Sequence, residues 1–98
     1  MSGIIFTPKT TQAALGTNTG AASNVGTCEF VRLINSADSG TEHLVTLEES
    51  GGTDIGTFTL GGHESVIIQK ATTDKLFAAD AAVLACGVRV ISKSGLVG

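Results

Sequence analysis

Several residue types that support common protein functions are scarce or missing in this sequence. Its 98 residues include no tryptophan, no tyrosine and four phenylalanines, so the aromatic platform on which many sugar-binding proteins hold their ligand is absent. Pro8 is the only proline, and no later residue therefore lacks the backbone N–H that a β-ladder uses. No apolar run approaches the roughly 20 residues of a membrane-spanning helix. The sequence predicts neither a membrane segment nor a signal peptide.

Basic residues are also few. Lys and Arg total 6 against 9 Asp and Glu, so the net charge is -3, whereas nucleic-acid-binding domains usually carry a positive surface. The charge is uneven along the chain: residues 1–26 carry +1, residues 27–64 carry -6 and residues 65–98 carry +2, which sum to -3. The balance argues against a nucleic-acid partner.

What the sequence does contain favours β-structure. Thr, Val and Ile contribute 13, 8 and 7 residues, and these β-branched side chains pack well on a pleated sheet. Thirteen glycines supply turns. At this length we expect one small domain, an all-β antiparallel sandwich of the immunoglobulin-like or jelly-roll-like type.

The strands are predicted from alternation of apolar and polar residues. In the segment 28–35 Val31 and Leu33 share one face, and Phe30, Arg32 and Ile34 share the other. Turn sequences at 35–40, 50–54 and 60–64 separate the segments, and 50–54 is expected to close a hairpin. The predicted strands are 28–35, 43–49, 55–60, 65–70 and 83–92, and a short strand or a single helical turn is predicted near 75–79.

The segment 73–85 also fits a helix. It is rich in alanine, Leu76, Phe77, Val83 and Leu84 match helical spacing, and Thr73 could cap the helix. The clean alternation from residue 83 onward favours strands instead.

The first 26 residues are predicted to form an extended N-terminal arm. Residues 8–26 are mostly Thr, Gly, Ala, Ser and Asn with little periodicity, and packing along their own domain is the equal alternative to contact with a neighbour. The predicted division is an arm at 1–26, a sandwich at 27–93 and a tail at 94–98. The arm and the tail supply the candidate partner-binding residues, which are Ile4, Ile5, Phe6, Leu15, Leu96 and Val97.

No catalytic, cofactor or metal site is predicted. His63-Glu64 lacks the second histidine of a zinc helix, because residue 67 is isoleucine. Asp38, Glu48, Glu49 and Asp54 could bind calcium only loosely, and a solvated acidic face is preferred. Cys28 and Cys86 are expected to be free buried thiols rather than a disulfide.

Two arginines lie on the outward faces of long predicted strands. Arg32 and Arg89 are expected to pair with acidic residues across the sheet. Docking on an acidic partner is the alternative.

The strand and turn pattern over residues 28–91 resembles short structural proteins of marine tailed phages, including cyanophages. The resemblance is carried by the strand end Val31–Asn35, the turn Gly62–Ser65, and Lys70 followed by Thr73 and Asp74. Its members are similar to head decoration, or cement, proteins. These are β-sandwich modules that sit on a capsid lattice and staple neighbouring subunits with terminal arms.

The resemblance implies a non-enzymatic virion protein that binds and stabilises the lattice of the major capsid protein. It would be made in the bacterial cytoplasm and located on the capsid surface, as a homo-oligomer that could be a trimer. A tail, neck or fibre-attachment module, or a free binding module, is the alternative. Neither a membrane nor a nucleic acid is an expected partner.

Overall fold

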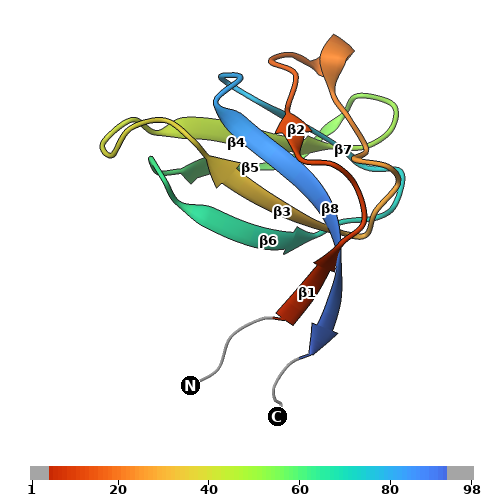
Figure 1. Cartoon of the computed structure of the whole chain (residues 1–98). Helices are drawn as coiled ribbons and strands as arrows, with labels where there is room; N and C mark the ends of the chain where they lie inside the picture. Colours follow the sequence, from red (N-terminus) through yellow and green to blue (C-terminus); the bar gives the residue numbers. More distant parts are fainter. Residues whose placement is uncertain (1–4, 93–98) are drawn as a thin grey trace.

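A computed structural model describes residues 5–92, which form two antiparallel sheets packed as a small β-sandwich (Figure 1). The predicted fold class is confirmed. The elements are β1 Ile5–Pro8, β2 Ala13–Ala14, the 3₁₀ turn η1 Thr19–Ala21, β3 Phe30–Asn35, β4 His43–Glu48, β5 Asp54–Leu60, β6 Ser65–Gln69, β7 Lys75–Ala78 and β8 Val83–Ser92. None of the helices within residues 5–92 is long and apolar enough to cross a membrane.

The larger sheet has five strands in the order β1-β8-β3-β6, with β2 also paired to β8. Strand β8 is the longest strand of this sheet and lies inside it, because β1 and β2 pair with one edge of β8 and β3 pairs with the other. The last β8 residue that pairs with β3 is Val88, opposite Phe30. Beyond this point β8 continues beside β1 as a two-stranded ribbon, which Figure 1 shows projecting from the sandwich.

The smaller sheet has the order β5-β4-β7. The predicted hairpin at 50–54 joins β4 to β5, and its glycine Gly52 has a φ of 97°, which side chains with a Cβ rarely adopt. The segment near 75–79, predicted as a short strand or a single helical turn, is the strand β7, which pairs with β4, and the helical alternative is wrong. Leu76 and Ala78 are fully buried in β7, as period-two burial requires.

The core lies between the two sheets. Val31 and Leu33 of β3 are fully buried, while Phe30, Arg32 and Ile34 are half-buried on the other face, which confirms the alternation predicted from the sequence. Val45 and Leu60 enter the core from the smaller sheet. The core therefore uses one face of each sheet and leaves the other to be covered or exposed.

The described part of the predicted arm packs along its own domain, which is the second of the two arrangements that the sequence leaves open. Residues 5–14 follow β8 as β1 and β2, and the chain then crosses to the other sheet. There Gly16 accepts a hydrogen bond from Ala78, and Ser23 exchanges two with Leu76. Leu15 and Val25 belong to the core.

Both cysteines are free and buried, as predicted. Cys28 packs against Gly87, and a Cβ added to Gly87 would clash with the side chain of Cys28. The Cys86 thiol instead lies 3.1 Å from the Thr10 carbonyl oxygen. Because Gly87 and Cys86 are consecutive in β8, their side-chain positions face opposite sides of the sheet, which keeps the two thiols apart.

Candidate interaction surface

The outward side of the five-stranded sheet is mostly apolar. Cross-strand pairing places Ile67 opposite Arg32, and Leu84 opposite Ile34. The same register places Phe6 of β1 opposite Val90 of β8. We call this surface the outer apolar face; its half-buried residues are Phe6, Phe30, Arg32, Ile34, Ile67, Leu84 and Val90.

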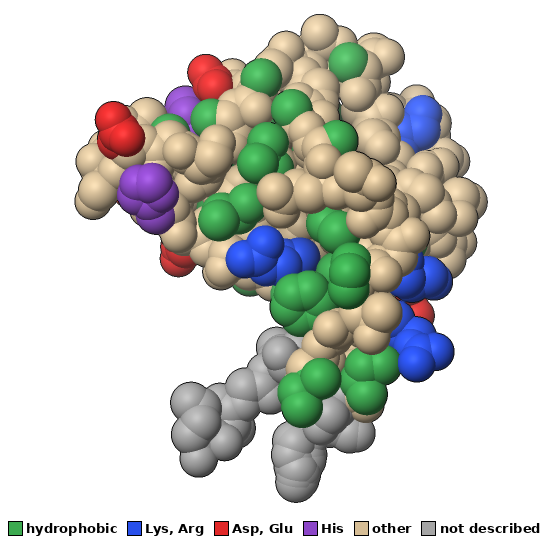
Figure 2. Space-filling model, in the orientation of Figure 1, with side chains coloured by type: hydrophobic (Ala, Val, Ile, Leu, Met, Phe, Trp, Pro, Cys, Tyr) green, Lys and Arg blue, Asp and Glu red, His purple; other side chains and the backbone are tan. Residues whose placement is uncertain are grey.

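Figure 2 shows hydrophobic side chains gathered on this side of the molecule and continuing onto the projecting ribbon. Within the ribbon Ile5 is 61% exposed and Ile91 is 45% exposed. Contiguous exposed apolar surface on a small protein is typical of an interaction site rather than of ordinary surface variation.

Arg32 is the charged residue of the outer apolar face. Its guanidinium carbon lies 6.0 Å from the centre of the Phe6 ring, within range of a cation–π contact. Within residues 5–92 the only ion-pair contact joins His43 and Asp80, so the expected pairing of Arg32 and Arg89 with acidic residues is wrong there. Glu29, which precedes β3, accepts a hydrogen bond from Gln69 instead.

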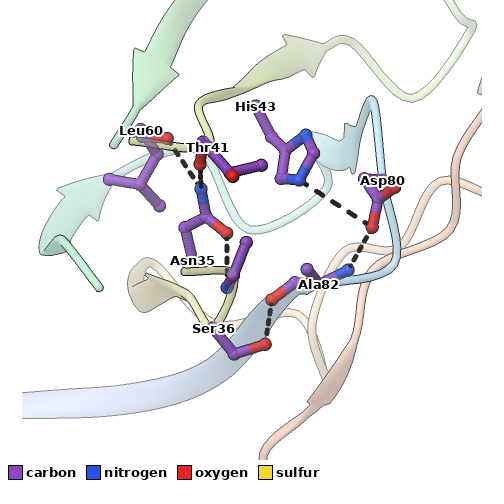
Figure 3. Close-up of polar contacts among 8 residues, drawn as sticks. Asn35, Ser36, Thr41, His43, Leu60, Asp80 and Ala82 are labelled. Atoms are coloured by element: carbon purple, nitrogen blue, oxygen red, sulfur yellow. Dashed lines mark hydrogen bonds and ion pairs between the residues drawn. The ribbon is translucent and has the colours of Figure 1, made fainter. Parts of the chain in front are cut away.

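The loops at one end of the sandwich are joined by a buried asparagine, Asn35 (Figure 3). Its amide nitrogen donates to the carbonyl oxygens of Thr41 and Leu60, each at 2.9 Å, and its side-chain oxygen accepts from the N–H of Ala37 at 3.0 Å. Its backbone also bonds with His63 and Glu64. Asn35 thus connects the β3–β4 loop and the end of β5 through its side chain, and the β5–β6 turn through its backbone.

This loop end is acidic. The loops that follow β3, β5 and β7 contain no lysine or arginine and expose four carboxylates. Asp80 lies 3.9 Å from Nε2 of His43 and accepts a hydrogen bond from the N–H of Ala82 (Figure 3). The exposed acidic residues of the loop end are Asp38, Glu42, Glu64 and Asp80.

The four acidic residues considered as calcium ligands, Asp38, Glu48, Glu49 and Asp54, do not form one site. Asp38 belongs to the loop end, whereas Glu48 lies at the far end of β4. Glu48 is buried. The Thr19 hydroxyl, which is the hydrogen-bond donor, lies 2.9 Å from one of its carboxylate oxygens and 2.6 Å from the other. Among the described residues no three His, Cys, Asp or Glu side chains are grouped to hold a metal ion.

Lys70 is a buried lysine with a shifted pKa. Burial lowers the pKa of its ammonium below the usual 10.5, and the negative charge of Asp74 partly opposes this. The ammonium donates to the carbonyl oxygens of Ala71 and Thr72 at 3.2 Å and 3.4 Å. These contacts hold a turn together, which is a structural use of the lysine.

A hollow of about 270 Å³ lies beneath the N-terminal segment. It is lined mostly by small residues, which are Thr10, Thr11, Ala13, Ala14, Leu15, Ser23, Val25, Gly26 and Ala85. Its lining contains no ionisable side chain, and its polar side chains are the hydroxyls of Thr10, Thr11 and Ser23.

The predicted partner-binding residues that the structure describes differ in how exposed they are. Ile5 is exposed on the ribbon and Phe6 is half-buried on the outer apolar face. Leu15 is only 4% exposed within the chain's own core, so its side chain cannot reach a partner in this fold. Ile4, Leu96 and Val97 lie outside the described residues.

Sequence reasoning missed most of the outer apolar face. Phe30, Ile34 and Ile67 carry the signal, because each is apolar although the neighbouring residues of its strand are the ones that pack in or against the core. A half-buried antiparallel strand normally has polar residues there. Comparison with known proteins adds no assignment, since no family model, curated protein or solved structure matches the chain.

Proposed function

We propose that this protein is a non-enzymatic structural component of a virion, a capsid decoration protein that binds and stabilises the lattice of the major capsid protein. The proposal starts from the likeness of its strands and turns to short structural proteins of tailed phages. Its partner is a protein surface, and it needs neither a cofactor nor a metal.

The observation that supports it most is the outer apolar face together with the ribbon. The face belongs to a sheet whose opposite side forms the core, so a partner can cover it without disturbing the fold. Its residues lie on four strands held in register by backbone hydrogen bonds. A preformed apolar surface loses little conformational entropy on binding, which suits a small protein that must bind a large rigid lattice.

Quantitative mass spectrometry of purified particles tests the proposal. The ratio of this chain to the major capsid protein should be near one copy, or one trimer, per few capsid subunits. A few copies per particle would move the assignment to the tail, neck or fibre attachment. No association with particles would overturn the virion assignment and leave a free binding module.

A further inference from the structure

We infer that the outer apolar face docks on a different protein whose apolar surface carries an aspartate or glutamate that pairs with Arg32. This inference rests on the proposed function and specifies which face of the chain meets the partner. It also specifies what chemistry the partner's surface must have.

The first argument is the position of Arg32. It lies among apolar neighbours, between Ile67 of β6 and Cys86 of β8, and it forms no ion pair with a described carboxylate. Docking would remove water from its guanidinium, and a charge buried in this way without a counter-charge is costly. A partner that covers the face must therefore bring a carboxylate to this point.

The second argument excludes a second copy as the occupant. Two copies stacked through the same face would bring two Arg32 side chains together in a water-poor interface, where like charges repel strongly. The chain's exposed acidic loops are also a poor match for the face. They consist mainly of Ala, Ser, Gly and Thr around their carboxylates, and so present little apolar surface. Because both of these self-contacts are disfavoured, we assign the complementary surface to another protein.

The third argument is the continuity of the surface. Phe6 and Val90 are a cross-strand pair that belongs both to the face and to the ribbon. A partner that covers Arg32 and this pair can therefore extend onto Ile5 and Ile91, which are their chain neighbours in the ribbon and are exposed. Apolar area around a central arginine resembles the arrangement of binding hot spots, in which surrounding contacts exclude water from the anchor.

The test measures binding of the purified chain to virus particles assembled without it. Four chains are compared: wild type, Arg32→Met, Ile67→Asp and the control Ile55→Asp. Ile55 is 51% exposed on β5, the edge strand of the other sheet, so it controls for placing an acid at an exposed isoleucine. Circular dichroism and thermal unfolding confirm that each variant is folded.

We expect Arg32→Met and Ile67→Asp each to weaken binding by about tenfold or more, and Ile55→Asp to change it by less than about twofold. Methionine is the decisive substitution, because it retains the apolar stem and leaves the partner's carboxylate without a counter-charge. If Arg32→Met bound as tightly as wild type or more tightly, the partner would have no carboxylate there and the inference would be wrong.

Two further results separate this inference from the proposed function. If wild type bound the particles and all three variants bound equally well, the face would be wrong while the decoration role stood. If wild type did not bind at all, both would fail. Analytical ultracentrifugation of the chain alone covers the remaining case: an oligomer broken by Ile67→Asp but not by Ile55→Asp would assign the face to a second copy and overturn the inference.

Discussion

At the scale of single residues, the fold depends on a few positions where only one side chain fits. Gly87, Asn35 and Lys70 each meet a separate demand: close packing, hydrogen bonding by buried polar groups, and burial of a charge. None of these roles is visible in the local pattern of hydrophobicity. Each depends on residues distant in the sequence that only the folded chain brings together.

Gly87→Ala should destabilise the protein. The new Cβ would collide with the Cys28 side chain and lie 3.1 Å from the Val25 carbonyl oxygen, and such overpacking typically costs about 1–3 kcal/mol. Chemical denaturation measures the loss. Gly56→Ala is the matched control, because no atom lies within 4 Å of its added Cβ in the middle of β5. Adding Cys28→Ala to Gly87→Ala should restore part of the stability, and equal stability of the two single variants would contradict this packing.

Asn35→Leu should lower the free energy of unfolding by about 3 kcal/mol or more. Leucine leaves the buried Leu60 carbonyl oxygen, and the part-buried Thr41 carbonyl oxygen and Ala37 N–H, without their partner, and an unpaired group costs about 1–3 kcal/mol when it is fully buried. Ser36→Ala is the neighbouring control, since it removes one exposed hydrogen bond to Ala82. Faster amide exchange in the β3–β4 loop of Asn35→Leu would show loss of loop order. Unchanged exchange would contradict the role of Asn35.

Lys70 predicts a specific pH dependence of stability. Its folded-state pKa is lowered, so between that pKa and 10.5 the unfolded chain holds more protons than the folded chain. The free energy of unfolding contributed by Lys70 must then rise with pH across this window. Relative to Lys70→Met, the wild type should gain stability as the pH rises from 8 to about 11. A difference that does not vary with pH would show that burial leaves this lysine unperturbed.

At the scale of elements, the period of two residues was enough to predict the central strands. Val83–Ser92 matches its predicted bounds, and Lys75–Ala78 forms a strand despite its alanine-rich context. The helical alternative loses because β7 places Leu76 and Ala78 in the core and pairs with β4. The segment before Cys28 could not be predicted, because its order comes from hydrogen bonds to β8 and β7 rather than from its own pattern.

Removing residues 2–26 should therefore prevent folding rather than release a soluble sandwich. The deletion takes away Leu15 and Val25 from the core and the partners of one edge of β7. Thermal unfolding followed by circular dichroism should show no cooperative transition. In the full chain Leu15→Ala should cost about 2–5 kcal/mol, whereas Thr11→Ala, at an exposed position, should cost little. A cooperative transition in the truncated chain would contradict this prediction and show that the sandwich folds without residues 2–26.

At the scale of the whole molecule, the loop end is acidic, whereas the outer apolar face and the ribbon lie on the five-stranded sheet; Leu44 and Ile55 are exposed on the three-stranded sheet. The loops after β3, β5 and β7 present carboxylates and contain no lysine or arginine, whereas the five-stranded sheet presents apolar side chains, Arg32 and the ribbon. An electrically polar molecule of this kind can bind in a defined orientation, because complementary potentials select one face over another. The expected orientation places the five-stranded sheet toward the partner and the acidic loops elsewhere.

Electron cryo-microscopy of particles that contain this chain tests the central claim most directly. The account predicts density for the sandwich repeated over the capsid lattice, with the outer apolar face and the ribbon against the major capsid protein and Arg32 beside one of its carboxylates. Density confined to the tail or neck, or a lattice contact made through the three-stranded sheet or the acidic loops, would contradict it.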